Sequence, residues 1–333
     1  MRRALRYIAW GLAAIVVLAL IAWFWAYHVA SGLYEKEWVV HSATFPIPFP
    51  LTEQELTVLR AERIAAGASA TDPLAGVDLN AIALERAIVR GRHLVESRTA
   101  CSDCHAKDFG GGTIIDAALV GHWVAPNLTS GRGSATQGFT ANDWDRAVRH
   151  GVRRSGRTSS MPSGDYVNLT DRELSDIVAY VTSMPPVDRD MGQVRLGPLF
   201  SFVIAKDPKT FVATTLDHSK PHAVEPPAAL ANAELGGHIA QVCRGCHGPN
   251  LSGGRLAGDP DMPIVANRTP HETGLKGWNE GDFIRAIREG KRKDGSAINT
   301  AMPWQAYGKM TDIELKAVWA YLQTVPPLAK GNH

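Results

Sequence analysis

An apolar run occupies residues 7–27, which contain no Asp, Glu, Lys, Arg or Pro. As a helix rising ~1.5 Å per residue, this run would span about 31 Å, enough to cross the hydrocarbon core of a membrane. Three arginines precede the run, which favours residues 1–6 on the cytoplasmic side and the rest of the chain on the opposite side. We predict a single-pass anchor at 7–27. A cleaved signal peptide is the alternative, but its apolar region would be unusually long and His28-Val29-Ala30 is a poor cleavage site.

Two later segments repeat apolar residues at the spacing of a helix with one buried face. Each begins with a capping box, Thr170 to Glu173 and Thr311 to Glu314. A Pro-Pro pair ends each segment, because proline cannot continue a helix. The apolar positions follow the i, i+3, i+4, i+7 pattern, as Leu174, Ile177, Val178 and Val181 in the first and Leu315, Val318, Trp319 and Leu322 in the second. No strand pattern competes, so the chain is predicted to be all-α.

These helices belong to an internal repeat of about 90 to 100 residues. Gly91-Arg-His93 corresponds to Gly236-Gly-His238, and Gly151 and Gly290 end a shorter helix in the middle of each copy. We expect Gly91 and Gly236 to let the first helix of each copy cross close to the last helix, against Tyr180 and Tyr321.

The repeat divides the chain into two domains and two linkers. We predict domains at 85–187 and 233–328, joined to the anchor by a linker at 28–84 and to each other by a linker at 188–232. In the first linker, Phe45 to Pro50 is expected to be extended, and a capping box at Thr52 is expected to open a helix that runs to about Ala66. In the second, the apolar run 199–205 is expected to pack onto a domain or to touch a partner or the bilayer surface.

The net charge of the chain beyond the apolar run gives little information about its partners. Beyond residue 30 there are 32 Lys and Arg (35 less the three before the apolar run) against 33 Asp and Glu, a net charge of −1. Such a balance does not indicate a nucleic-acid partner.

All four cysteines lie in two copies of the pattern C-x-x-C-H, which attaches haem c. The thiols of Cys101 and Cys104, and of Cys243 and Cys246, are expected to form thioether bonds to two haems. His105 and His247 are expected to bind the iron atoms. A zinc site usually needs four ligands, and a disulfide redox motif would lie beside a βαβ pattern, so both alternatives are weaker.

Methionine is a suitable sixth ligand for such an iron. Met161 and Met302 each begin a Met-Pro pair in a polar loop at the same place in both repeats, and we predict that they bind the two irons. Met262 also begins a Met-Pro pair but lies too close to His247. His150 is a possible spare ligand, although glutamate replaces it in the second repeat, which favours a surface helix position.

With these motifs, each repeat resembles a class I cytochrome c domain. The run Pro126-Asn127-Leu-Thr129 and the Met161-Pro pattern resemble the cytochrome c subunits of periplasmic alcohol and gluconate dehydrogenases. This resemblance implies that Asn127, Thr129, Asn267 and Thr269 help to hold the haem propionates; ordinary turn chemistry is the alternative.

The resemblance also implies a function. We expect a dihaem electron carrier of the bacterial inner membrane with its haem domains in the periplasm. Its partners would be a dehydrogenase or quinol-oxidising complex as donor and a small cytochrome or terminal oxidase as acceptor. A dihaem peroxidase is the enzymatic alternative, but it needs an iron with an open position, and matched methionines in both repeats argue against that.

Overall fold

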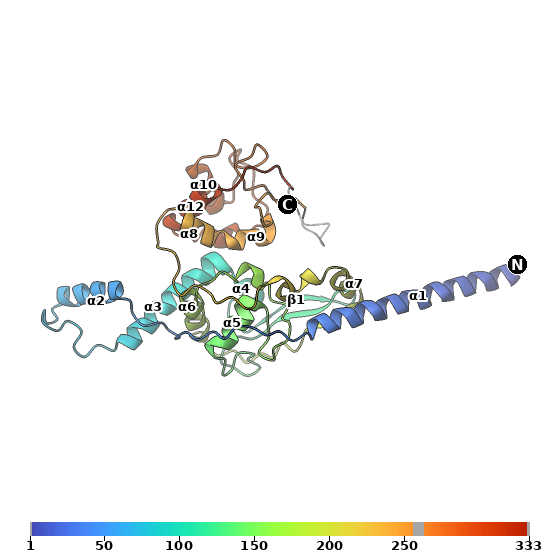
Figure 1. Ribbon diagram of the computed structural model, residues 1–333, viewed down its shortest axis with the longest axis horizontal. Helices are drawn as coiled ribbons and strands as arrows, with labels where there is room; N and C mark the ends of the chain where they lie inside the picture. The colour runs from blue at the N-terminus through green and yellow to red at the C-terminus, as the bar shows by residue number, and fades with distance from the viewer. Residues whose placement is uncertain (1, 256–262, 332–333) are drawn as a thin grey trace.

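The computed structural model describes residues 2–255 and 263–331, so that Met262 lies outside the described residues. A long N-terminal helix projects from the body of the molecule, the first repeat lies at its inner end, and the second repeat packs on the first (Figure 1).

Helices make up most of the regular structure. In chain order they are α1 (Arg2–Tyr34), α2 (Glu53–Ala65), α3 (Leu79–Leu94), α4 (Ser102–His105), α5 (Ala141–His150), α6 (Asp171–Thr182), α7 (Pro198–Lys206), α8 (Ala233–Ile239), α9 (Gln241–His247), α10 (Glu280–Glu289), α11 (Trp304–Tyr307) and α12 (Asp312–Leu322). In the part of the chain that the structure describes, the other helical turns are the π-helical turn η1 (Val95–Thr99) and the 3₁₀ turns η2 (Ser163–Asp165), η3 (Pro208–Thr210) and η4 (Val212–Thr215).

The predicted helix ends are confirmed. Thr170 and Thr311 begin α6 and α12 with complete capping boxes, and Thr52 does the same for α2. Gly151 and Gly290 end α5 and α10 in the left-handed conformation, which glycine adopts at no steric cost.

In each repeat the first helix crosses the last helix at a glycine. A Cβ on Gly91 would collide with the Asp176 carbonyl oxygen and lie 2.8 Å from the Tyr180 Cβ. A Cβ on Gly236 would collide in the same way with the Ala317 carbonyl oxygen on α12. Both close approaches were predicted, and both depend on the absence of a side chain.

The all-α prediction is only partly right, because the first repeat carries a small antiparallel sheet. Strands β1 (Gly112–Ala117), β2 (Gly121–Ala125) and β3 (Arg195–Leu196) lie in the order β1-β2-β3. The first two form a hairpin, and the third comes from the segment between the repeats. Such short strands, one of them paired over some 70 residues of sequence, leave little periodicity to detect.

Helix α1 is long and apolar enough to cross a membrane, with a mean hydropathy of 2.3 in its most apolar window. It continues past the predicted end at Tyr27 to Tyr34, and its last turns pack on the first repeat. Ala30 on α1 and Ile204 on α7 are fully buried, in one cluster with Trp123 of β2 and Phe211. The apolar run 199–205 therefore packs onto a domain, the first of the three outcomes considered for it.

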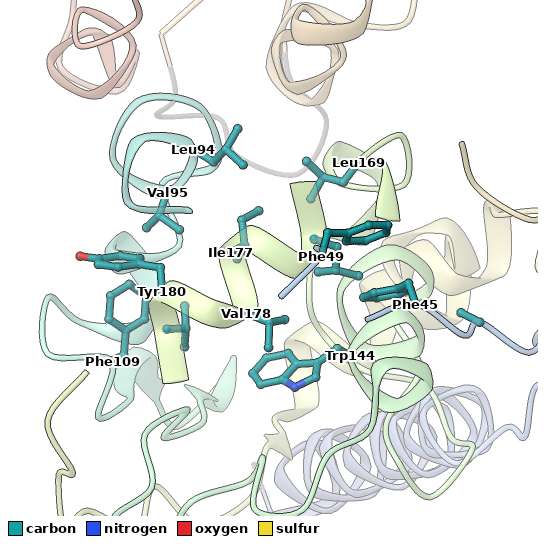
Figure 2. Packing of buried hydrophobic residues seen from close by; sticks show 13 residues of the cluster. Phe45, Phe49, Leu94, Val95, Phe109, Trp144, Leu169, Ile177, Val178 and Tyr180 are labelled. Carbon is teal, nitrogen blue, oxygen red and sulfur yellow. The ribbon is translucent and has the colours of Figure 1, made fainter. Parts of the chain in front are cut away.

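The linker 28–84 also contributes to the core of the first repeat. Phe45 and Phe49 are buried beside Trp144 and Leu169 (Figure 2). Their rings lie parallel with centroids 6.4 Å apart. Two proline-spaced aromatic side chains thus fix an extended segment against the domain.

Candidate haem-binding sites

The first C-x-x-C-H motif lies on the short helix α4, directly after the π-helical turn η1. Ala100, in the left-handed conformation with φ of 47°, separates the two and turns the chain into the motif. The His105 Nδ1 atom lies 2.9 Å from the carbonyl oxygen of Pro126, and since a carbonyl only accepts, Nδ1 carries the proton. The Nε2 lone pair is then available to a metal.

The second motif lies at the end of α9 and repeats this arrangement. The His247 Nδ1 atom donates to the carbonyl oxygen of Ala266 over 2.7 Å. Burial lowers the pKa of His105, and it lowers the pKa of His247 to about 3. Both rings are therefore neutral at neutral pH, as an iron ligand must be.

The four cysteines of the two motifs are the attachment points expected for haem. Burial raises the pKa of Cys101 and raises the pKa of Cys243 to about 11 while their thiols are free. Once thioether bonds to a haem have formed, these sulfur atoms no longer titrate.

The two Met-Pro pairs share one backbone conformation. Pro162 and Pro303 have φ, ψ of −77°, 59° and −78°, 54°, which is an inverse γ-turn. In each turn the residue after proline donates its backbone N–H to the methionine carbonyl, over 2.8 Å to Met161 and 2.7 Å to Met302. Both methionines are half-buried and precede a short helical turn, η2 or α11.

Comparison with known families agrees with this geometry. The family described as "Cytochrome C oxidase, cbb3-type, subunit III" matches residues 86–181, and the family described as "Cytochrome c" matches residues 233–326. The chain contains two cytochrome c domains. Each carries one C-x-x-C-H motif, so the protein holds two covalently bound haem c groups.

Similar proteins include both dihaem cytochromes and dehydrogenase subunits. A protein of Cereibacter sphaeroides described as "Diheme cytochrome c-type" is 26% identical over 68% of this chain and 82% of its own length. The fructose dehydrogenase cytochrome subunit of Gluconobacter japonicus is 37% identical over 26% of this chain and 19% of its own length. The alcohol dehydrogenase (quinone) cytochrome c subunit of Gluconacetobacter polyoxogenes is 33% identical over 32% of this chain and 25% of its own length. The chain thus spans a quarter or less of these dehydrogenase subunits.

In both cytochrome c domains the Asn and Thr residues predicted near the haem propionates form a buried turn. Asn127 Oδ1 accepts from the backbone N–H and the hydroxyl of Thr129, over 2.9 and 2.8 Å. Its Nδ2 donates to the carbonyl oxygen of Val187 over 2.7 Å. Asn267 and Thr269 repeat the turn. The structure therefore shows the turn role, and contact with a propionate stays a prediction.

The two domains pack through reciprocal contacts. His93 at the end of α3 contacts Glu314 at the start of α12 over 2.8 Å. His238 of α8 contacts Glu173 of α6, also over 2.8 Å. His93 and His238 are equivalent positions of the repeat, as are Glu173 and Glu314, so each domain offers the same histidine and the same glutamate to the other. The packing is that of an approximate twofold dimer.

This packing brings each haem-binding segment against the other domain. Turn η2, just after Met161, contacts α9, and α11, just after Met302, contacts η1. The Asp165 carboxylate lies so close to Gly245, inside the second C-x-x-C-H motif, that a Cβ there would force the carboxylate to move. Burial raises the pKa of Asp165 to about 6. Sequence reasoning missed these interface residues, although the matched His and Glu positions of the repeat were a usable signal.

The prediction that His150 occupies a surface position on its helix is wrong. Its side chain is fully buried on α5, because His218 and His222 from the segment between the domains cover it. Glu289, at the equivalent position of the second repeat, is exposed.

Proposed function

We propose that this chain is a membrane-anchored dihaem electron carrier. It would accept electrons from a periplasmic or membrane dehydrogenase or a quinol-oxidising donor and deliver them to a downstream cytochrome or terminal oxidase. The bound haems supply one-electron redox chemistry, and the protein's task is to hold both of them close together and to shield them.

The observation that carries the proposal is the reciprocal packing of the two haem-binding segments. Each Met-Pro loop reaches across the interface to the segment that carries or precedes the other motif. An enzyme that used only one haem for chemistry would gain little from such symmetry. A carrier that must exchange electrons within one chain gains a short, rigid path.

Met161 and Met302 would supply the sixth iron ligand. Their matched inverse γ-turns and half-burial support this assignment, since the same backbone presents both side chains. Methionine opposite histidine raises the reduction potential, which suits an acceptor of electrons from a dehydrogenase.

Helix α1 would serve as the membrane anchor, with both domains in the periplasm. Its length and hydropathy support this placement, as does the docking of its last turns on the first domain. The dehydrogenase donor is proposed on the relatives' names, which describe cytochrome subunits of fructose and alcohol dehydrogenases.

A test uses the full-length, haem-loaded protein in detergent, with the variants Met161→Ala and Met302→Ala. We expect the ferric wild type to show a methionine–iron charge-transfer band, each variant to lose about half of it, and Met191→Ala, the matched control, to keep it all. The reduced wild type should be oxidised rapidly by a small soluble cytochrome. A high-spin ferric signal in the wild type, together with turnover of hydrogen peroxide, would instead establish the peroxidase alternative.

A further inference from the structure

A cluster of polar side chains that the haem sites do not use lies where three separate segments meet. His41 comes from the segment after α1, Asp145 and His150 from α5, and His222 from the segment between the domains. One ligand atom from each of these four residues lies within 4.8 Å of the ligand atoms of the other three. Asp145 and His150 are fully buried, and the side chains of His41 and His222 are 14% and 9% exposed.

The separations suit a small four-coordinate ion. The His150 Nε2 atom lies 3.0 Å from His222 Nε2 and 3.7 Å from Asp145 Oδ2. The Asp145 Oδ2 atom lies 3.8 Å from His41 Nε2, and Asp145 Oδ1 lies 3.6 Å from His222 Nε2. Around a tetrahedral zinc ion with bonds near 2.0 to 2.1 Å, neighbouring ligand atoms are about 3.3 Å apart. All of the separations among the four ligand atoms are within 4.8 Å, so the ligand atoms would have to approach one another by at most about 1.5 Å to close the site.

The hydrogen bonds around the cluster fix which atoms face its centre. The His218 Nε2 atom lies 2.9 Å from the carbonyl oxygen of Ala213 and must donate to it, so His218 Nδ1 is an acceptor. The His150 Nδ1 atom, 3.0 Å from His218 Nδ1, therefore donates, and the lone pair of His150 lies on Nε2, toward His222. His218 thus orients His150 as the outer partner of a metal-binding histidine does.

The two carboxylate oxygens of Asp145 have different surroundings. Its Oδ1 accepts from Arg149 Nε over 2.7 Å, and Arg149 is balanced in turn by Asp171 at 2.8 Å. Its Oδ2, which faces the histidines, is buried and accepts no hydrogen bond from any residue that the structure describes. A buried carboxylate oxygen without a partner is costly, so the cluster needs a positive species at this point.

We propose that His41, Asp145, His150 and His222 bind a divalent transition-metal ion, for which zinc is the best match. Three imidazoles and one carboxylate form a closed tetrahedral set with no position left for substrate, which is the arrangement of a structural site. The ion fastens the segment that leaves the membrane helix and the segment that leads to the second domain onto α5. The site therefore sets how both cytochrome c domains sit relative to the anchor, independently of the haem ligands.

The test uses the full-length, haem-loaded protein in detergent, stripped with dipicolinate, desalted and titrated with zinc chloride alone. The variants His41→Gln and His222→Gln each remove a ligand that lies on a covering segment, outside the helical core. His271→Gln in the second domain is the matched control, since His271 is half-buried and its side chain contacts only Thr273 among the described hydrogen bonds. Two haems per chain, measured by mass, confirms that each variant has folded.

We expect the wild type and His271→Gln to bind one zinc per chain, and His41→Gln and His222→Gln to bind it at least tenfold more weakly. The zinc X-ray absorption spectrum should show nitrogen and oxygen ligands near 2.0 to 2.1 Å with the outer-shell signal of imidazole. Zinc should also slow proteolysis within residues 36–50 and 216–230. The proposal is wrong if the folded wild type binds zinc no better than the two ligand variants, or if the spectrum shows sulfur ligands.

Discussion

The contact between His238 and Glu173 offers a direct test of the interface between the two domains. The His238 Nε2 atom lies 2.8 Å from Glu173 Oε2, and the Arg98 Nη1 atom lies 3.0 Å from Glu173 Oε1. The Glu173 side chain is only 5% exposed. Replacing it with glutamine keeps the shape of the side chain and an acceptor for the capping box, and removes the charge.

The size of the effect follows from the carboxyl's pKa. Burial alone would raise the pKa of Glu173, but the hydrogen bond from His238 and the charge of Arg98 outweigh burial and lower it from 4.5 to about 2. Each pKa unit corresponds to about 1.4 kcal/mol between the two protonation states. Glu173→Gln should therefore lower the free energy of unfolding by roughly 3 kcal/mol at pH 7.

The pH dependence of stability provides a second test of this prediction. Because the folded-state pKa is depressed, the ionised carboxylate stabilises the fold above about pH 4.5, and this contribution is lost as the pH falls toward 2. The stability difference between wild type and Glu173→Gln should therefore be largest near neutral pH and shrink below pH 4.5. Neutral glutamine has no corresponding titration.

The assay is guanidinium unfolding of the haem-loaded protein, followed by far-ultraviolet circular dichroism from pH 7 to pH 3. Glu289→Gln, at an exposed position on α10, is the matched control and should stay within about 0.5 kcal/mol of wild type. In a double-mutant cycle with His238→Gln, the two losses should overlap by about 1 kcal/mol or more. A loss below about 0.5 kcal/mol at pH 7, or a difference that does not change down to pH 3, would refute the reasoning.

Two further predictions concern the scaffold of each domain. Gly91→Ala and Gly236→Ala each place a Cβ against a backbone carbonyl of the crossing helix, and each should destabilise the protein by about 1 to 3 kcal/mol or more in thermal unfolding. The control Gly32→Ala meets open space and should leave the melting temperature unchanged. An unchanged melting temperature in both Gly91→Ala and Gly236→Ala would contradict the crossing geometry. Asn127→Ala removes the side chain that bonds both the Thr129 backbone N–H and the Val187 carbonyl, and it should lower the free energy of unfolding by about 1 to 3 kcal/mol. The exposed Asn168→Ala should be silent in the same measurement, and equal melting temperatures for the two would show that the buried turn does not stabilise the domain.

Local chemistry made much of this protein predictable from sequence. The C-x-x-C-H motifs, the capping boxes at Thr170 and Thr311 and the crossing at Gly91 each depend on residues close together or on a contact that only glycine allows. These features were found because every one of them occurs twice, at matching places in the repeat.

What could not be predicted depends on segments that return from far along the chain. The burial of His150 depends on His222, 72 residues later, and β2 gains its second partner from Arg195–Leu196. In the sequence Phe45 lies in a proline-rich segment typical of a spacer, but in the structure its ring packs into the core of the first domain. In each case the local pattern is weak, and tertiary packing decides the outcome.

The reciprocal histidine–glutamate contacts carry a consequence for how strong the interface must be. Each domain holds both halves of the contact, so either one on its own could associate with an identical copy as an isologous homodimer. One chain is the covalently joined form of that pair. Joining two such units raises their effective concentration to about the millimolar range, so even a weak mutual affinity suffices to hold the two redox centres at a constant separation.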